Sequence, residues 1–179
     1  PGSPGSESFW LEGDGAVQMH PETGVLFLGG LSGEFFVSFW LYPATVDEGT
    51  RLLYWQGRHP MTGDVQRMSL TVSQQRLVFA ASELLRDREQ VRRDVELVPW
   101  GPLLPRTWSH HEISFDASSG ILAYRVDGVV EALEIGLSGA DFGLTIEGLV
   151  FGEGYRGLLD GIRFGARAPD PNRAASVAG

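Results

Sequence analysis

The sequence predicts an all-β fold, a two-sheet antiparallel β-sandwich of the jelly-roll type, and two observations predict it. Short stretches of alternating apolar and polar residues recur along the 179 residues, and glycine-rich segments separate them; the chain has 24 glycines. Alternation with a period of two is typical of a strand with one face in a core. No convincing helical stripe interrupts the series, so we expect one domain built from many short strands.

The segment 34–43 (EFFVSFWLYP) predicts a central strand, because both of its faces are apolar. One face should lie in the core and the other should line a concave surface. The first face carries Phe35, Val37, Phe39 and Leu41, and the second carries Phe36, Ser38, Trp40 and Tyr42.

Later segments predict hairpins and closing strands. Strands are expected at 67–72 and 76–81, joined by a short polar turn, and over 121–135. In that last segment Asp127 and Gly128 supply the positive φ angles of a tight turn. The segments 144–152 and 156–165 predict two late strands.

The densely charged segment 82–100 fits this scheme least well. Its beginning could form a turn or two of helix, but we expect a solvated excursion that returns as a strand at 94–98. The functional alternative is a protruding element that touches a partner.

Composition limits the partners and the compartment. The formal charge of −9 disfavours nucleic acid and anionic membrane surfaces. The absence of cysteine excludes disulfides, thiolate nucleophiles and cysteine-ligated zinc. No stretch is apolar enough to predict a transmembrane segment. All fourteen basic residues are arginine, which we interpret as the coding bias of a GC-rich bacterial genome.

The segment 108–116 (WSHHEISFD) concentrates groups that could perform acid–base chemistry. As a strand, it would place His110, Glu112 and Asp116 on one face and His111 among apolar residues on the other. A histidine on an apolar face is most often a neutral, hydrogen-bonded core residue. We therefore expect His111 to be structural.

Six phrases in this order resemble the laminin G-like and concanavalin A-like lectin/glucanase superfamily. They are FWLEGDGAVQMHP, FFVSFWLYP, LLYWQG, WSHHEISFD, GILAYRVDGVV and YRGLLDGIRFGARAP, which together extend over about 9–169. The resemblance implies a jelly-roll domain over 9–169, with a linker at 1–8 and a tail at 170–179. It also implies an extracytoplasmic protein of bacterial type.

Glucanases of this superfamily carry alternating carboxylates along one strand, and no segment reproduces their spacing. Glu112 and Asp116, followed by Glu131 and Glu134, come nearest. No nucleophile elbow, phosphate loop or zinc-protease motif is present either. We therefore expect no enzyme activity.

Two kinds of binding site remain open. Sugar recognition needs exposed aromatic rings beside planar polar groups, and the candidates at strand ends and in loops are Trp55, Gln56, Arg58, His59, Trp100, Tyr155 and Arg156. Asp160 points toward apolar neighbours, so it should accept hydrogen bonds from the backbone or His111, or else bind a structural Ca²⁺ together with Asp14.

These observations leave three function classes. The first is a noncatalytic module that binds a glycan or a protein surface. The second is a structural or assembly subunit of a bacterial envelope or surface appendage, with self-assembly or partner subunits. The third and least favoured is a glycan hydrolase or lyase.

Overall fold

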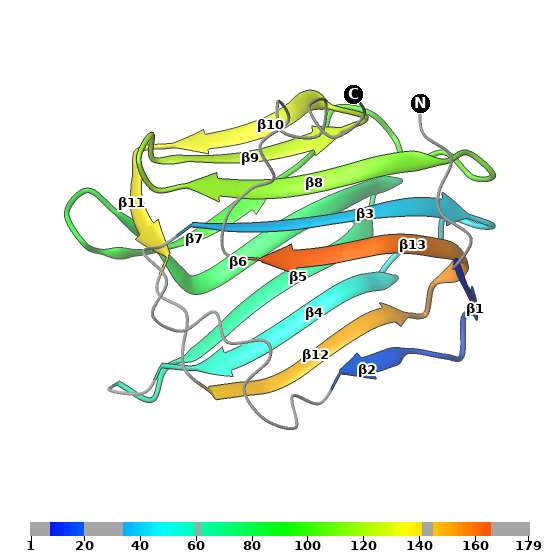
Figure 1. Ribbon diagram of the computed structural model, residues 1–179, viewed down its shortest axis with the longest axis horizontal. Helices are drawn as coiled ribbons and strands as arrows, with labels where there is room; N and C mark the ends of the chain where they lie inside the picture. Colours follow the sequence, from blue (N-terminus) through cyan, green and yellow to red (C-terminus); the bar gives the residue numbers. More distant parts are fainter. Residues whose placement is uncertain (1–7, 20–33, 60–61, 141–144, 166–179) are drawn as a thin grey trace, which may run out of the picture.

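The computed structural model describes residues 8–19, 34–59, 62–140 and 145–165, which form two antiparallel sheets packed face to face (Figure 1). The six-stranded sheet has the order β1 (Phe9–Glu12), β13 (Arg156–Gly165), β3 (Phe35–Pro43), β8 (Ser109–Asp116), β9 (Ile121–Val126) and β10 (Val129–Ile135). The seven-stranded sheet has the order β11 (Leu137–Ala140), β6 (Arg76–Asp87), β5 (Val65–Ser73), β4 (Arg51–Arg58), β12 (Thr145–Glu153) and β2 (Val17–Met19), and β7 (Arg92–Leu97) pairs with β6. The predicted two-sheet antiparallel sandwich is confirmed.

The core lies between the sheets and is built by strand alternation. The four residues of β3 that were expected to face inward, Phe35, Val37, Phe39 and Leu41, are all buried. The facing sheet contributes Trp55, Leu70 and Phe79, which are also buried. Burial of side chains of this size stabilises the fold by roughly 1.5–3 kcal/mol each.

The predicted tight turn at Asp127 and Gly128 joins β9 to β10. Their φ angles are 50° and 81°, so both central residues have the left-handed conformation that matches the twist of a hairpin. Gln74 and Gln75, with φ angles of 51° and 59°, make the corresponding turn between β5 and β6.

A bulge in β13 overturns the prediction that Asp160 points toward apolar neighbours, because it puts Asp160 on the other face from Ile162 and Phe164. The register shifts between Asp160, which lies opposite Trp40, and Arg163, which lies opposite Ser38. Gly161 permits the irregularity through its φ of 58°. Asp160 and Arg163 therefore lie on the outer face of the sheet, whereas Phe164 packs against the core.

His111 is a buried core residue, as the sequence predicts. Its ring stacks on Phe39 with a centroid distance of 5.4 Å, and its two nitrogens contact Ser109 Oγ at 2.8 Å and Tyr124 Oη at 3.0 Å. Burial lowers the pKa of His111 to about 3, and the neighbouring His110 acts in the same direction. The ring is therefore neutral at physiological pH.

The charged segment 82–100 forms a hairpin arm rather than a helix. β6 continues to Asp87, a turn follows, and β7 returns from Arg92, two residues earlier than the expected strand. Arg92, next to the turn, pairs with Asp64, at 2.5 Å, and with Glu83, at 3.2 Å, and these contacts hold the arm in place.

The predicted tail at 170–179 and nearly all of the predicted linker at 1–8 lie outside the described residues. The described residues form no helix that is long and apolar enough to cross a membrane.

Candidate functional site

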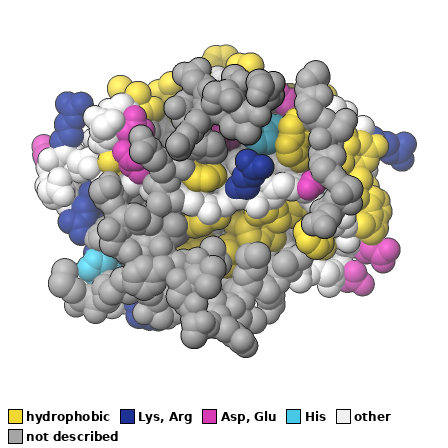
Figure 2. Space-filling model, viewed as in Figure 1, with side chains coloured by type: hydrophobic (Ala, Val, Ile, Leu, Met, Phe, Trp, Pro, Cys, Tyr) yellow, Lys and Arg dark blue, Asp and Glu magenta, His cyan; other side chains and the backbone are white. Residues whose placement is uncertain are grey.

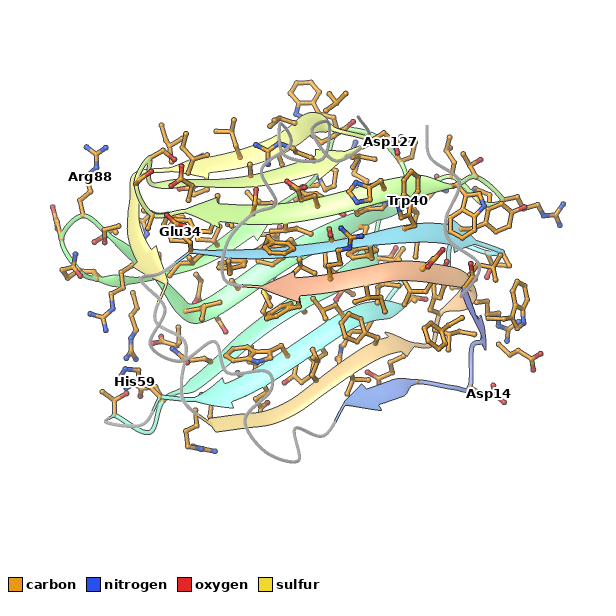
Figure 3. The ribbon with its side chains drawn as sticks, in the orientation of Figure 1. Asp14, Glu34, Trp40, His59, Arg88 and Asp127 are labelled. Atoms are coloured by element: carbon orange, nitrogen blue, oxygen red, sulfur yellow. The ribbon has the colours of Figure 1, made fainter. Side chains whose placement is uncertain are left out.

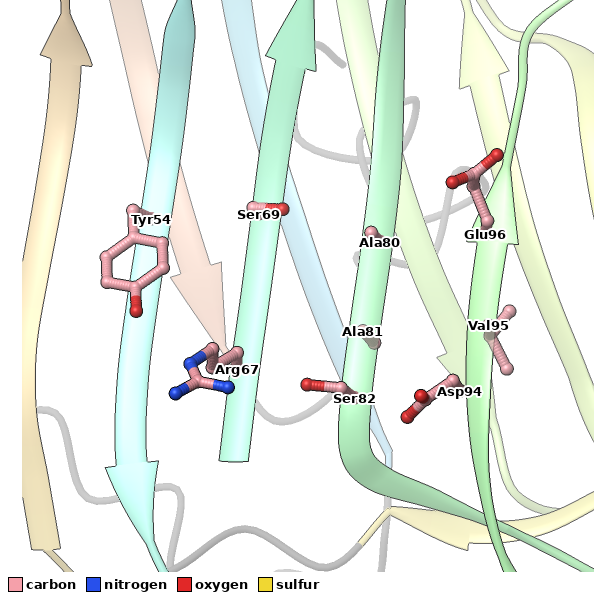
Figure 4. Close-up of a pocket in the computed structure, with 9 residues that line it drawn as sticks. All are labelled: Tyr54, Arg67, Ser69, Ala80, Ala81, Ser82, Asp94, Val95 and Glu96. Atoms are coloured by element: carbon pink, nitrogen blue, oxygen red, sulfur yellow. The ribbon is translucent and has the colours of Figure 1, made fainter. Parts of the chain in front are cut away.

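An open groove of about 320 Å³ lies on the outer face of the seven-stranded sheet. Figure 4 shows its two sides: Tyr54 and Arg67, from β4 and β5, face Asp94 and Glu96, from β7. Between them lie the small side chains of Ser69, Ala80 and Ser82. The groove therefore combines an aromatic ring, a cation, two carboxylates and a floor that leaves room for a ligand.

Strand alternation places these side chains on one surface. Leu53, Trp55, Met68, Leu70, Val95 and Leu97 are buried, so the residues between them point to solvent. The register then aligns the outward residues across the sheet: Tyr54 lies opposite Ser69, Arg67 opposite Ser82, and Ala80 opposite Glu96.

The Tyr54 side of the groove is held by its own contacts. Tyr54 Oη donates a hydrogen bond of 2.6 Å to Gln56 Oε1. Arg51 Cζ lies 4.8 Å from the centroid of the Tyr54 ring, and the Arg51 guanidinium is paired with Glu153 at 3.1 Å. A cation over the ring and an acceptor for its hydroxyl hold Tyr54 in one orientation before any ligand binds.

The charged side chains of the groove do not neutralise one another. Arg67, Asp94 and Glu96 are all exposed, and none of them forms an ion pair within the described part of the chain. The groove thus offers hydrogen-bond donors on one side and acceptors on the other, both available to a ligand.

The structure corrects two of the sequence-predicted ligand residues. Trp55 is only 1% exposed because it points into the core from β4. Tyr155 is 2% exposed, and its hydroxyl donates a hydrogen bond of 3.1 Å to Leu158 O. Burial raises the pKa of Tyr155. Neither ring can serve as a platform for a sugar.

Three more predicted residues lie at the end of β4 that holds Arg58. Gln56 contacts Tyr54 at the edge of the groove, whereas Arg58 is exposed and donates a hydrogen bond of 2.9 Å to Gly63 O. His59 is buried, and its Nδ1 accepts a hydrogen bond of 3.2 Å from the Thr62 amide.

The last two predicted residues lie elsewhere. Arg156 is exposed at the start of β13. It follows the end of β12, which pairs with Arg51, and Arg51 and Arg58 are the two ends of β4. Trp100 is 83% exposed, in the loop after β7. The seven predicted residues therefore do not form one site, and only Gln56 adjoins the groove.

The structure does not bring together Asp14 and Asp160, the two residues predicted to share a Ca²⁺ ion. Asp160 accepts hydrogen bonds from Ser8 Oγ, at 3.3 Å, and from the Gly161 amide, at 2.6 Å, at one end of β1. Asp14 is exposed beyond the other end, at the edge of the molecule in Figure 3. The four-residue strand between them is roughly 13 Å long, and the described residues contain no group of three or more potential metal ligands.

This arrangement gives a prediction for chelation. Exhaustive treatment with a calcium chelator should leave the melting temperature unchanged, because backbone and hydroxyl donors already bind the Asp160 carboxylate. Thermal unfolding followed by circular dichroism measures this. A lower melting temperature that added Ca²⁺ restores, in the wild type but not in Asp160→Asn, would contradict the expectation.

The polar groups of the segment 108–116 have structural partners. Arg125 donates hydrogen bonds to Glu112, at 3.1 Å, and to Ser114, at 2.7 Å. Asp116 accepts hydrogen bonds from Ser118 and Ser119, which lower the pKa of its carboxyl. His110 packs against Trp40 with a centroid distance of 5.0 Å. The segment is therefore part of the scaffold.

A second, smaller cavity of about 250 Å³ lies under the loop after β7. Leu103, Trp108 and Val126 contribute to its lining, and His111 is at its wall. Both nitrogens of His111 already have partners, so this cavity offers a ligand less polar chemistry than the groove.

Comparison with known proteins identifies the fold. No protein-family model matches the chain, and no curated protein matches it, but solved structures do. Domain 4 of the extracellular arabinanase AbnA of Geobacillus stearothermophilus, solved with arabinotriose, superposes with a TM-score of 0.67 at 15% identity, over 99% of this chain and 80% of that one. The fold is that of the concanavalin A-like lectins and glucanases. Two further structures with this fold are the sialidase module CBM40 of Ruminococcus gnavus and a leech trans-sialidase.

The two further matches differ in how much of the other protein they cover. The CBM40 module matches with a TM-score of 0.62 at 11% identity, over 97% of both chains, and has also been solved with α2,3-sialyllactose. The leech intramolecular trans-sialidase matches with a TM-score of 0.58 at 12% identity, over 93% of this chain but only 26% of that one. At these identities the matches establish the concanavalin A-like fold alone.

Proposed function

We propose that this protein is a noncatalytic, extracytoplasmic module that binds glycans in the groove formed by β4, β5, β6 and β7. The observation that carries the proposal is the Tyr54 ring facing two carboxylates across a floor of small residues. A sugar presents apolar C–H faces and a rim of hydroxyls, so it is bound by an aromatic ring together with fixed polar groups.

The donors and acceptors of the groove suit a hydroxyl-rich ligand. Arg67 can only donate hydrogen bonds, whereas ionised Asp94 and Glu96 can only accept them. A sugar hydroxyl does both, so one glycan can contact the two sides of the groove. The carboxylates also disfavour strongly anionic glycans by repulsion, and we expect a ligand with little negative charge.

Exposure of the carboxylates supports binding rather than catalysis. A glycosidase needs one carboxylic acid that is shielded from water and so stays protonated. Asp94 and Glu96 are both exposed, and Glu112 is bonded to Arg125. Matches to a glycan-binding module and to an accessory domain of an extracellular enzyme favour the same function and an extracytoplasmic location.

The proposal predicts which variants lose binding. Tyr54→Ala and Arg67→Ala should each weaken glycan affinity at least about 10-fold, since removal of a central aromatic or arginine contact typically costs more than 1.4 kcal/mol. Arg156→Ala is the matched control, because Arg156 is exposed but lies outside the groove. A glycan array followed by isothermal titration calorimetry measures the affinities.

Each result of this experiment has a clear meaning. Binding that is lost in Tyr54→Ala and kept in Arg156→Ala supports the proposal. A panel of neutral and acidic polysaccharides that gives no binding would overturn it, as would binding that survives both groove substitutions. Release of reducing ends by the wild type would contradict the noncatalytic assignment.

A further inference from the structure

The second cavity, under the loop between β7 and β8, is covered by a loop that backbone hydrogen bonds hold in place. The Leu103 amide donates a hydrogen bond of 2.6 Å to Gln75 O, in the turn between β5 and β6. The Arg106 amide donates one of 2.6 Å to Pro43 O, at the end of β3. The loop is therefore attached to both sheets, and the cavity of about 250 Å³ is present before any ligand binds.

The wall of this cavity is mostly apolar. Leu77 and Val126 contribute from the two sheets, and Leu103 and Trp108 contribute from the loop and its end. Leu77 and Leu103 are buried, so this part of the wall is shielded from water. Since an apolar cavity of roughly 150 Å³ can hold a benzene ring, this one has room for a ring with a short side arm.

The charges at the cavity are all negative. Among the described residues that line it, Asp127 and Glu131 are acidic and none is an arginine. His111 also lines the cavity, but its buried ring is neutral at physiological pH. Figure 2 shows hydrophobic and acidic atoms along the edge of the molecule where Figure 1 places β9 and β10. The cavity thus combines an apolar body with negative charge.

Each of the two carboxylates uses one oxygen to hold the fold. Asp127 Oδ1 accepts a hydrogen bond of 2.8 Å from the His110 amide, and Glu131 Oε2 accepts one of 2.7 Å from the Gly101 amide. Within the described part of the chain, neither Asp127 nor Glu131 forms an ion pair or accepts a further hydrogen bond. Because an ionised carboxylate can only accept, its second oxygen suits a cationic donor.

We propose that this cavity binds a small hydrophobic cation, with an apolar body in the cavity and an ammonium group on Asp127 and Glu131. Two carboxylates repel an anionic ligand, and a neutral ligand forms no hydrogen bond between two charged groups. The Trp108 ring favours a cation as well. The cavity shares no lining residue with the groove on the seven-stranded sheet, so this site does not depend on the proposed glycan binding.

Three probe molecules separate the contribution of the apolar body from that of the charge. 2-Phenylethylammonium carries a ring and a positive charge, phenylacetate carries the ring with a negative charge, and ethylammonium carries the positive charge without the ring. NMR titration of the full chain at neutral pH measures each dissociation constant from the amide shifts of Gly101 and His110, which donate to the two carboxylates. 2-Phenylethylammonium should bind at least about 10-fold more tightly than either other probe.

Conservative substitutions remove the two charges but keep the hydrogen bonds of the fold. Glutamine at Glu131 and asparagine at Asp127 each retain an oxygen that can accept from the Gly101 or His110 amide. Asparagine also tolerates the φ of 50° at Asp127. The double variant Asp127→Asn, Glu131→Gln should therefore remain folded, as circular dichroism would show, and should bind 2-phenylethylammonium at least about 10-fold more weakly.

The matched control is the double variant Glu12→Gln, Asp14→Asn. It also removes two exposed carboxylates, and Asp14 lies far from Asp127 in Figure 3, so this variant should bind like the wild type. Equal weakening by both double variants would overturn the proposal, because it would show attraction to negative charge in general. A wild type that does not bind 2-phenylethylammonium, or that binds phenylacetate equally well, would overturn it whether or not the variants fold.

Discussion

The substitution Gly157→Ala is expected to lower the free energy of unfolding by about 3–4 kcal/mol, a fall of roughly 10 °C in melting temperature. A Cβ atom at Gly157 would overlap the backbone carbonyl oxygen of Tyr42 and lie 2.6 Å from Tyr155 Oη and 2.9 Å from the Ala44 amide. Two of these three neighbours are backbone atoms, one in β3 and one directly after it in an amide that donates a hydrogen bond to Arg156 O, so they cannot move without breaking pairing. Gly157 also has a φ of 147°, which side chains rarely adopt.

Gly154→Ala separates the effect of the positive φ angle from the effect of the steric overlap. Gly154 has a φ of 76°, but a Cβ there would meet no atom within 4 Å. Gly154→Ala should therefore lower the free energy of unfolding by only about 1 kcal/mol, the cost of placing a residue with a Cβ in a left-handed backbone conformation. Thermal and urea denaturation of both variants measure the difference. Equal destabilisation by the two substitutions would show that the close approach of β13 to β3 is less tight than the structure indicates.

Acidification from pH 7.5 to pH 4.5 is expected to cost roughly 2–3 kcal/mol of stability through His111 alone. The unfolded chain binds a proton at His111 near pH 6.5, whereas the folded chain binds it only near pH 3 because burial lowers that pKa. Between these values the unfolded state holds more protons. The stability from this group is therefore full above pH 6.5 and falls as the pH drops toward 3.

The matched controls for this prediction are His111→Gln and His110→Gln. Removing the buried imidazole should flatten the stability profile between pH 6.5 and 4.5, although the variant is less stable overall. His110 is half-buried, and burial also lowers its pKa, so His110→Gln should leave most of the slope. Carboxyls with lowered pKa values, such as that of Asp116, act only at more acidic pH. A slope that persists in His111→Gln would contradict the assignment.

Alternation along the strands was sufficient to predict the architecture. The inward residues of β3, the turn at Asp127 and Gly128, and the buried His111 all follow from a period of two. The bulge in β13 could not be predicted in this way. A single glycine, Gly161, lets the strand add a residue, and every side chain after it changes face.

The candidate site was harder to predict because its residues come from four strands, β4, β5, β6 and β7, and lie far apart in the sequence. In the strand predicted at 67–72, Met68, Leu70 and Val72 alternate with polar residues and are buried. The polar residues on the opposite face, which include Arg67 and Ser69, are the signal that could have indicated the groove. Trp55 suggested a platform by residue type, yet its register makes it a core residue and makes its neighbour Tyr54 the exposed ring. Register across the sheet, which one sequence does not supply, brings these residues together.

The hairpin arm of β6 and β7 carries one side of the proposed binding groove. Asp94 and Glu96 lie on β7, and among the described strands β7 pairs with β6. This side of the groove therefore belongs to the hairpin arm at the periphery of the sheet. Its tip, at Arg88 and Glu89, is exposed and remote from the packed interior. If the groove binds glycans as proposed, a change in the length or charge of this arm changes which sugar it accepts, while the two packed sheets keep their stability.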